Sequence, residues 1–322
     1  MPLMIFNNLA INAEAARLRE DILQAIDNDA DELIKFLYSF LEARDAPGTT
    51  LESARVVKEH LANYNIRTVT VSPPNAAPSL TSLINHDEGS SLVMSSLLLV
   101  PTPDFPLSPS SITNDFYNLY NNSPRNTTSV QPSQMQHQHV TAYPVPTNMS
   151  IKTSTAATVA AYTYLHARQS LFSGSITLLA LSDDEAGSYR SLDYLLHHDE
   201  RKELFIGDCV LNASPTFPGN VLLGGDGSCG VSETLVNAVV RSVKDVQGRG
   251  PRVEEAKGMT YCDGWENLGV PVCSYGMERG APSICGGAGT ARQDQVDEEG
   301  FLRLVKVLTL AAWDYMREDG DE

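Results

Sequence analysis

Residues 181–188 of the chain read LSDDEAGS, and this stretch decides how the rest of the sequence is interpreted. It follows the apolar run ITLLAL at residues 176–181, whose length and composition predict a buried strand. Three consecutive carboxylates at the end of a buried strand repel one another unless a cation, a proton or water compensates them. Alternatively, the three acids have no role in a site: they lie in a solvated loop, or they cap the helix predicted at residues 192–198. The acidic triplet therefore marks this strand end as the first candidate for a metal-dependent hydrolytic site.

Outward from this strand, apolar runs alternate with segments that have helical periodicity. The pattern predicts strands at residues 66–71, 91–100, 176–181, 209–212 and 270–274, and helices at 13–26, 31–42, 51–62, 155–168, 192–198, 233–246 and 298–316. Alternating strands and helices predict the α/β class, with three layers, a mostly parallel or mixed sheet, and helices on both faces. The strongly apolar run at 91–100 predicts a central strand. The run at 66–71, which Pro73 and Pro74 follow, predicts an edge strand.

Composition limits the classes of function. The chain has 322 residues, of which 42% are hydrophobic, and we expect a single α/β domain over residues 1–322. Its net charge of −17 argues against nucleic acid and anionic membrane surfaces as partners, because phosphate binding needs clustered Lys and Arg. No apolar run reaches ~18 residues, so no membrane span is predicted. Five cysteines without CxxC spacing, and no signal peptide, predict reduced thiols and a cytoplasmic protein.

One segment interrupts the alternating pattern. Residues 103–148 are rich in Ser, Asn, Pro, Thr and Gln, and such a composition cannot bury enough apolar surface to form a core. We therefore expect a low-complexity, largely disordered insertion. His137 and His139 lie within it, and a polar loop explains them better than a metal site does. His60 stands alone on the predicted helix 51–62, and we expect a solvated or hydrogen-bonded residue there rather than a ligand.

Several motifs together resemble one known family. These are LVMSSLLLVP (92–101), similar to LLxGHxDVVP; SIKTSTAA (150–157), similar to DMKGGxAA; SDDEAGS (182–188), similar to DEExGS; CVLNASPT (209–216), similar to a strand ending in (D/E)PT; and the closing stretches GMT (258–260), LGVPVCSYG (268–276) and DQVDEEGFLRL (294–304). The family is that of the aminoacylases, acetylornithine deacetylases and succinyl-diaminopimelate desuccinylases, which are zinc metallopeptidases. The resemblance covers most of the chain outside the insertion, and implies a zinc-peptidase-like catalytic domain.

In that family two zinc ions are held by five side chains, and the first Glu of DEE is the general base. Most of these side chains are missing here. The first His falls on Ser96 and the Asp that orients it on Leu98. The bridging Asp falls on Ser150, the acid before PT on Ser214, and the final His on Asp294. The resemblance thus leaves Glu185 and Asp294 as remnant metal positions, and Asp184 at the general-base position.

This loss predicts a degenerate scaffold. Catalytic zinc sites need three protein ligands as a rule, and serine hydroxyls are poor zinc ligands. We therefore expect no zinc and no other cofactor, no hydrolysis, and a function in binding a protein partner or a small amino-acid-like ligand. An active N-acyl amino acid deacylase or dipeptidase is the alternative. It would need a rebuilt site for zinc or another divalent metal such as Mg, Mn or Ca. Its candidate ligands are Asp183, Asp184, Glu185 and Asp294, with Asp208 or Asp226.

A further departure concerns the lid domain that members of the family carry after the (D/E)PT strand. Here residues 217–231 are predicted to be a short connection that replaces the lid, so we expect no lid-mediated homodimer, but a monomer or a heteromer. The connection includes GGDGSCG at 224–230, which lacks the Lys and the spacing of a phosphate-binding loop. A serine hydrolase using Ser96 or Ser150 is the least favoured reading, because no His has a context that would place it beside either residue.

Overall fold

The computed structural model describes residues 2–46, 49–74, 77–86, 88–100, 148–184, 190–214, 220–224, 232–255, 263–277 and 296–318. Within these ranges the chain folds around one mixed sheet of eight strands, in the order β1-β2-β4-β3-β5-β8-β6-β7. The strands are β1 (Val69–Val71), β2 (Ser79–Asn85), β3 (Ser91–Val100), β4 (Ser175–Asp184), β5 (Cys209–Asn212), β6 (Asn220–Leu223), β7 (Arg252–Glu255) and β8 (Val272–Ser274).

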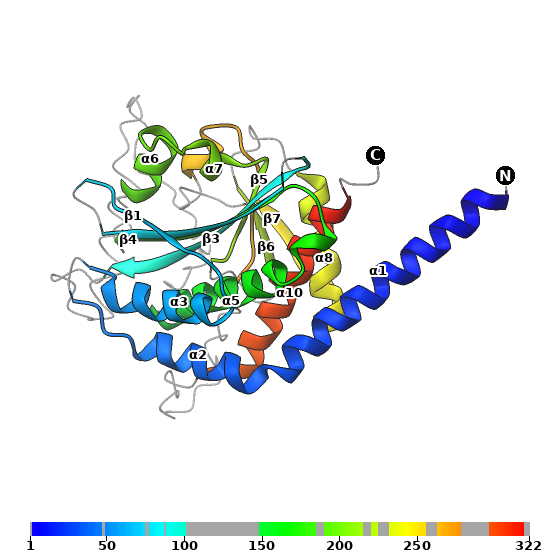
Figure 1. Cartoon of the computed structure of the whole chain (residues 1–322), viewed down its shortest axis with the longest axis horizontal. Helices are drawn as coiled ribbons and strands as arrows, with labels where there is room; N and C mark the ends of the chain where they lie inside the picture. The colour runs from blue at the N-terminus through cyan, green and yellow to red at the C-terminus, as the bar shows by residue number, and fades with distance from the viewer. Residues whose placement is uncertain are drawn as a thin grey trace, which may run out of the picture.

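Helices cover both faces of this sheet, as predicted. Figure 1 shows α6 and α7 on one face, and α2, α3, α5 and α10 on the other. The helices are α1 (Pro2–Asn28), α2 (Ala30–Glu42), α3 (Leu51–Asn63), α5 (Asn148–His166), α6 (Arg190–His197), α7 (Glu203–Ile206), α8 (Glu233–Gln247), α9 (Asp263–Glu266) and α10 (Glu298–Glu318). The predicted fold class, α/β with three layers and a mixed sheet, is confirmed.

The strand order confirms the predicted centre and edge of the sheet. β3 lies between β4 and β5 and runs parallel to both, and β5 runs parallel to β8. β1 is an edge strand that pairs with β2. The sequence did not predict β2, whose polar residues interrupt its apolar ones, nor the four-residue strands β6 and β7. β6 falls inside the predicted connection 217–231, and most of the remaining connection lies outside the described residues.

Helix α5 starts earlier than its sequence pattern predicts. It begins at Asn148 rather than residue 155, so the segment that resembles DMKGG is helical. Two threonine hydroxyls donate to the carbonyl one turn earlier, Thr153 to Met149 at 2.8 Å and Thr158 to Ser154 at 3.0 Å, and Thr155 Oγ1 lies 3.1 Å from the carbonyl of Ile151. These bonds satisfy the hydroxyls inside the buried helix. The predicted insertion at 103–148 lies outside the described residues, except for its last residue.

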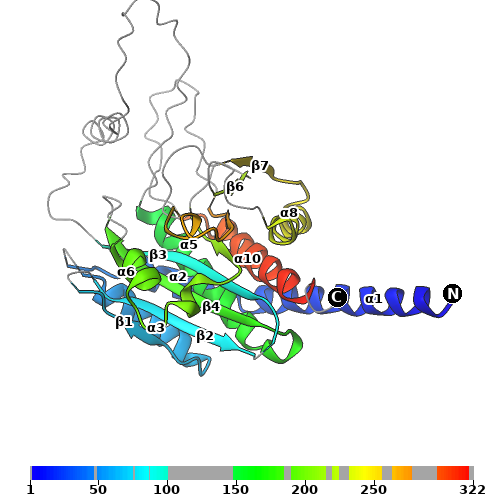
Figure 2. The ribbon, with the colours of Figure 1, turned by 90° about the horizontal axis from the view of Figure 1, so that it is seen from above.

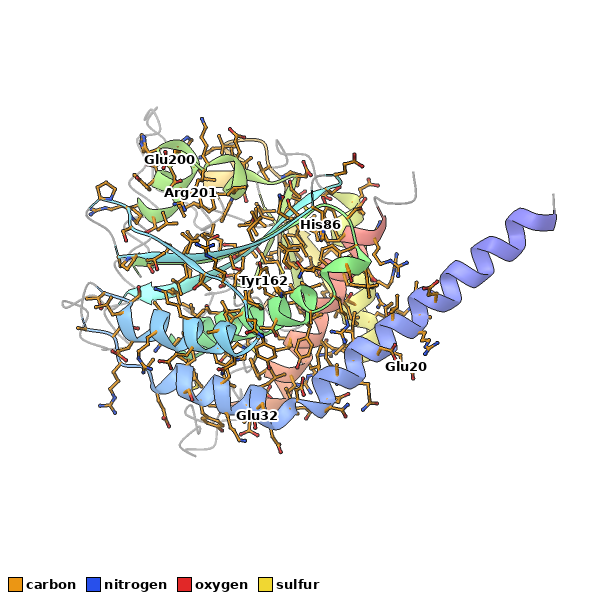
Figure 3. All side chains as sticks on the ribbon, in the orientation of Figure 1. Glu20, Glu32, His86, Tyr162, Glu200 and Arg201 are labelled. Carbon is orange, nitrogen blue, oxygen red and sulfur yellow. The ribbon has the colours of Figure 1, made fainter. Side chains whose placement is uncertain are left out.

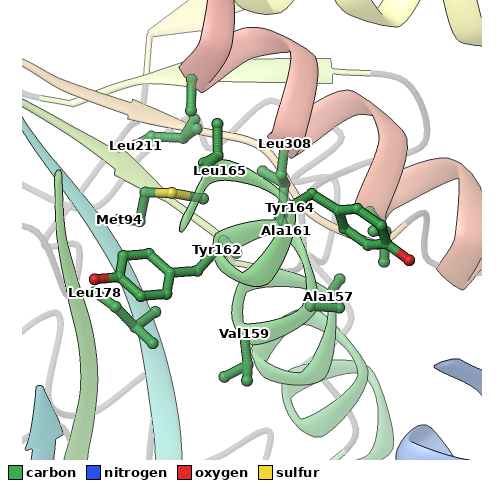
Figure 4. Close-up of a cluster of buried hydrophobic side chains, with 14 of the residues drawn as sticks. Met94, Ala157, Val159, Ala161, Tyr162, Tyr164, Leu165, Leu178, Leu211 and Leu308 are labelled. Carbon is green, nitrogen blue, oxygen red and sulfur yellow. The ribbon is translucent and has the colours of Figure 1, made fainter. Parts of the chain in front are cut away.

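The main core lies between the sheet and the α5–α10 layer. Met94 of β3, Leu178 of β4 and Leu211 of β5 are buried there, where α5 crosses the sheet (Figure 4). Each such side chain contributes about 1.5–3 kcal/mol through burial. Tyr162 of α5, labelled in Figure 3, donates its hydroxyl to Ser82 Oγ at 3.2 Å, which satisfies a polar group inside this layer.

A second cluster lies on the opposite face. Val93 of β3 and Val210 of β5 pack there against Leu195 of α6 and Trp265 of α9. Because side chains of a strand alternate between the faces, even-numbered residues of β3 point to the α5 layer and odd-numbered residues to the α6 layer. This alternation determines which side of the sheet each candidate residue serves.

Helix α1 is fixed to the body through its C-terminal half, and its N-terminal half extends away from the other elements (Figure 2). Ile22 and Ile26 are buried, and Arg19 forms ion pairs with Asp314 of α10 and Asp245 of α8. No helix in the described part of the chain is long and apolar enough to cross a membrane.

Candidate functional site

The candidate site is at the carboxyl edge of the parallel strands. β3, β4, β5 and β8 all end at this edge, where open α/β sheets commonly bind ligands. β4 reaches it with Asp184, which pairs with Val100 of β3. Ser214 lies two residues beyond the end of β5 and is half-buried. The side chains of Asp183 and Asp184, and the whole of Glu185, Asp226 and Asp294, lie outside the described residues.

Ser96 stands inside the sheet rather than at its surface. It pairs with Ala180 of β4, it is fully buried, and its even number places it on the α5 side. Its Oγ has no hydrogen-bond partner among the described residues. Leu98, at the position where the resemblance places an orienting Asp, is also fully buried in the main core. The central strand therefore presents a neutral hydroxyl and an aliphatic side chain where a ligand and its orienting acid would be needed.

Ser150 lies in the first turn of α5, and two contacts fix this end of the helix against the carboxyl edge. Thr155 Oγ1 donates to the carbonyl of Leu97 in β3 at 2.6 Å, and the N–H of Met277 donates to Ser154 Oγ at 3.4 Å. Ser150 itself is half-buried. Ser96, Ser150 and Ser214 thus come from three elements that meet at one edge, although Ser96 lies beneath α5 and not in an open site.

Lys152, which corresponds to the Lys of the motif DMKGG, has a structural role. Its Nζ donates to the carbonyl of Ala43 at 2.7 Å and lies 3.4 Å from the carbonyl of Phe40, at the end of α2. A cation at this position neutralises the unpaired carbonyls at a helix C-terminus. Burial lowers the pKa of Lys152, with Asp45 acting in the opposite direction.

A set of hydroxyl groups fixes the end of β4. Ser182 Oγ lies 2.5 Å from the carbonyl of Pro78 and 2.9 Å from Thr50 Oγ1, and Ser182 N donates to Ser79 Oγ at 3.0 Å. Ser191, at the start of α6, donates to the carbonyl of Ser182 at 2.6 Å. These contacts connect β2, α3 and α6 to the residue immediately before Asp183, and so hold the acidic strand end in place.

Asp208 does not belong to this edge. Its carboxylate accepts hydrogen bonds from the N–H and the hydroxyl of Ser91, at 2.6 and 3.1 Å, at the start of β3. β3 runs from Ser91 to Val100, so Asp208 and Asp184 are separated by about 30 Å at ~3.3 Å per residue. The suggestion that Asp208 could join a carboxylate site with Asp184 is therefore wrong, because the two acids lie at opposite ends of parallel strands.

His60 is buried rather than solvated, and its ring packs against aromatic side chains, which the sequence did not predict. Its side chain is buried, its ring stacks on Phe36 with centroids 3.7 Å apart, and its Nε2 has no partner among the described residues. Burial lowers the pKa of His60 to about 4, so the ring is neutral at physiological pH. Across the described part of the chain, no three His, Cys, Asp or Glu side chains lie close enough together to hold a metal ion.

The sequence reasoning missed a row of polar side chains on the α6 side of the sheet. Ser95 of β3 pairs with Asn212 of β5, and Asn212 pairs with Ser274 of β8. All three are buried, and Asn212 Nδ2 donates to Ser274 Oγ at 3.2 Å. We call these three residues the polar row. Ser95 lies in the middle of β3, whereas Asn212 and Ser274 each end their strand, and only the register of the strands shows that the three lie side by side.

Comparisons with known proteins identify the fold. No family model and no curated protein matches the sequence. The LapA aminopeptidase of Legionella pneumophila superposes with a TM-score of 0.57 at 11% identity, covering 92% of this chain and 74% of that one. The aminopeptidase PepT of Bacillus cereus gives 0.55 at 8% identity, covering 89% and 98%. The YXEP protein of Bacillus subtilis, a dinuclear metal binding peptidase from the M20 family, gives 0.52 at 9%, covering 89% and 98%. The chain therefore has a metallopeptidase-like fold.

Proposed function

We propose that this chain is a catalytically degenerate member of the metallohydrolase scaffold used by deacetylases, aminoacylases and carboxypeptidases, and that it acts by binding. Its partner would be another protein or a small amino-acid-like ligand. One observation carries the proposal: Ser96 and Leu98 of β3, the central strand, are fully buried. The motif resemblance puts a zinc ligand and its orienting acid at these two positions.

The chemistry of these positions supports this proposal. Serine hydroxyls at positions 96, 150 and 214 are neutral at physiological pH, whereas structural and catalytic zinc ions are held by imidazole, thiolate and carboxylate groups. Loss of one outer-shell partner alone lowers metal affinity or activity by about 10–100-fold. Several ligands are replaced here together, so the residues do not fit a zinc pair of the family type.

Metal analysis combined with an activity assay tests the proposal. Purified chain, prepared without added metal, is expected to contain less than one equivalent of any divalent metal by elemental analysis. It is expected not to hydrolyse N-acyl amino acids or dipeptides, with or without added zinc. The variant Glu185→Gln should have unchanged activity and nearly unchanged stability. Stoichiometric metal, together with hydrolysis that a chelator abolishes, would show that the proposal is wrong.

A second candidate function is an active metal-dependent amidohydrolase with a rebuilt carboxylate site. One observation favours it: β4 brings Asp183 and Asp184 to the carboxyl edge, in a segment that hydrogen bonds hold in place. Asp184 would then serve as the general base, and Glu185 and Asp294 as ligands of Mg, Mn or Ca. Hydrolysis that depends on Mn²⁺ or Mg²⁺ and is lost in Glu185→Gln would support this candidate over the first.

A further inference from the structure

The edge strand β7 has one side without a neighbouring strand. It is the last strand of the sheet, and it pairs in parallel with β6. All four of its residues, Arg252–Glu255, are exposed, and Val253 has 44% of its surface accessible. In a parallel ladder, alternate residues direct their N–H and C=O groups away from the neighbour. No further backbone hydrogen bond reaches β7 within the described part of the chain, so this edge can pair with another strand.

The side chains of β7 divide between the two faces of the sheet. Val253 pairs with Val221 of β6, which is fully buried in the main core, so Val253 lies on the core face. Arg252 and Glu254 alternate with Val253 and lie on the opposite face. Neither of these two charged residues has an ion-pair partner among the residues that the structure describes. The edge therefore presents an exposed apolar side chain on one face and two unpaired charges of opposite sign on the other.

The order of these charges is complementary to itself in one register. When two copies of a strand pair antiparallel about a two-fold axis, one residue stands opposite its own copy, and the residues on either side of it stand opposite each other. With Val253 at the axis, Arg252 of each copy stands opposite Glu254 of the other. An axis at Arg252, at Glu254 or at Glu255 would instead put two like charges opposite each other. Only the register centred on Val253 pairs opposite charges and avoids like ones.

The same register also covers the exposed apolar side chain. Directly opposite residues of antiparallel strands have their Cβ atoms about 4.5–5.5 Å apart, so Val253 would pack against its own copy beside the buried Val221. Edge strands that are protected from pairing commonly carry charges that repel a second strand. The charges of β7 attract a second copy of β7 in this register, although the net charge of −17 opposes the approach of two whole chains. A short strand also buries little area, and a weak, reversible contact is therefore expected.

We propose that two copies of this chain associate through β7, which pairs antiparallel with its copy about a two-fold axis at Val253. The two eight-stranded sheets then form one continuous sheet. This assembly needs no lid domain, and it differs from the monomer or heteromer expected from the sequence, an expectation that rested on the lid alone. The proposal concerns assembly, so it stands or falls independently of whether the chain hydrolyses or only binds.

Sedimentation velocity of the full chain tests the proposal. We expect a reversible monomer–dimer equilibrium with a dissociation constant in the micromolar range. Arg252→Glu puts two glutamates opposite each other, and Glu254→Arg puts two arginines opposite each other, so each variant should weaken the dimer by about tenfold or more. A mixture of these two single variants should dimerise again, because both pairs in the mixed dimer join opposite charges. The double variant Arg252→Glu/Glu254→Arg also restores opposite charges and should dimerise as the wild type does.

Glu255→Arg is the matched control. It changes the net charge by the same amount as Glu254→Arg, but position 255 lies outside the two charge pairs, so the dissociation constant should stay within about threefold of the wild-type value. All these positions are exposed, and circular dichroism should show the same fold in every variant.

Three results would overturn the proposal. The first is a wild-type chain that remains monomeric at about 300 µM, well above the expected dissociation constant. The second is a mixture of Arg252→Glu and Glu254→Arg that dimerises no better than either variant alone, because the contact would then lie elsewhere. The third is a loss in Glu255→Arg as large as that in Glu254→Arg, because net charge and not pairing across β7 would then explain the effect.

Discussion

Replacing His60 should remove a measurable part of the pH dependence of folding. The imidazole is buried against Phe36 with an unpaired Nε2, and burial lowers its pKa from 6.5 to about 4. Above pH 6.5 the ring is neutral in both the folded and the unfolded chain. As the pH falls below 6.5, the unfolded chain takes up a proton that the folded chain does not. The free energy of unfolding therefore decreases through this range, until the folded state also protonates near pH 4.

The size of this effect follows from the two pKa values. With 1.36 kcal/mol for each pKa step, the loss is about 1.4 kcal/mol at pH 5.5 and approaches ~3 kcal/mol below pH 4. A comparison of pH 7.5 with pH 5.5 avoids the isoelectric region, since the sequence pI is near 4.7. Urea unfolding, followed by far-UV circular dichroism, gives the free energy at each pH. His60→Phe keeps an aromatic ring against Phe36 but cannot take up a proton.

The wild-type chain should lose about 1.4 kcal/mol more than His60→Phe between these two pH values. His198→Gln removes an exposed imidazole and should behave as the wild type. Other groups titrate in all three proteins, so the difference between them isolates His60. If wild type and His60→Phe lose stability in parallel, the ring is not held neutral by burial, and the reasoning fails.

Three further substitutions test the packing at the end of β4, inside β3 and at helix α1. Ser182→Ala removes the hydroxyl bonded to Pro78 and Thr50 and should lower the free energy of unfolding by about 2 kcal/mol in urea titrations; an unchanged midpoint would contradict this role. Ser96→Ala removes a buried hydroxyl without a described partner and should leave stability equal or raise it by up to ~1 kcal/mol, so a marked loss would reveal a missing partner. Arg19→Ala removes the ion pairs with Asp314 and Asp245 that anchor α1, and should cost on the order of 2 kcal/mol. It should also speed hydrogen exchange in α1, and uniform exchange across the chain would argue against local anchoring.

Part of the candidate site could be inferred from the sequence. The run at 176–181 and the acids after it identified a strand that ends at the carboxyl edge, and the structure places Asp184 there. The sequence could not exclude Asp208 as a neighbour of Asp184. Asp208 precedes β5 and Asp184 ends β4, and only the parallel pairing of these strands with β3 shows that the two acids lie at opposite edges of the sheet. His60 was misjudged for a similar reason, since its burial depends on α2 packing against α3.

By itself the sequence determined the fold class, because runs of apolar residues with strand and helix periodicity bury their side chains in only a few layered arrangements. It also determined which ionisable groups stand at the positions that resemble zinc ligands, since side-chain chemistry needs no coordinates. The tertiary structure alone decided which residues are neighbours. Strand register made Ser95, Asn212 and Ser274 one row, and the alternation of side chains put Ser96 on the opposite face. That register is set by hydrogen bonds between strands that are distant in sequence, so local sequence patterns do not predict it.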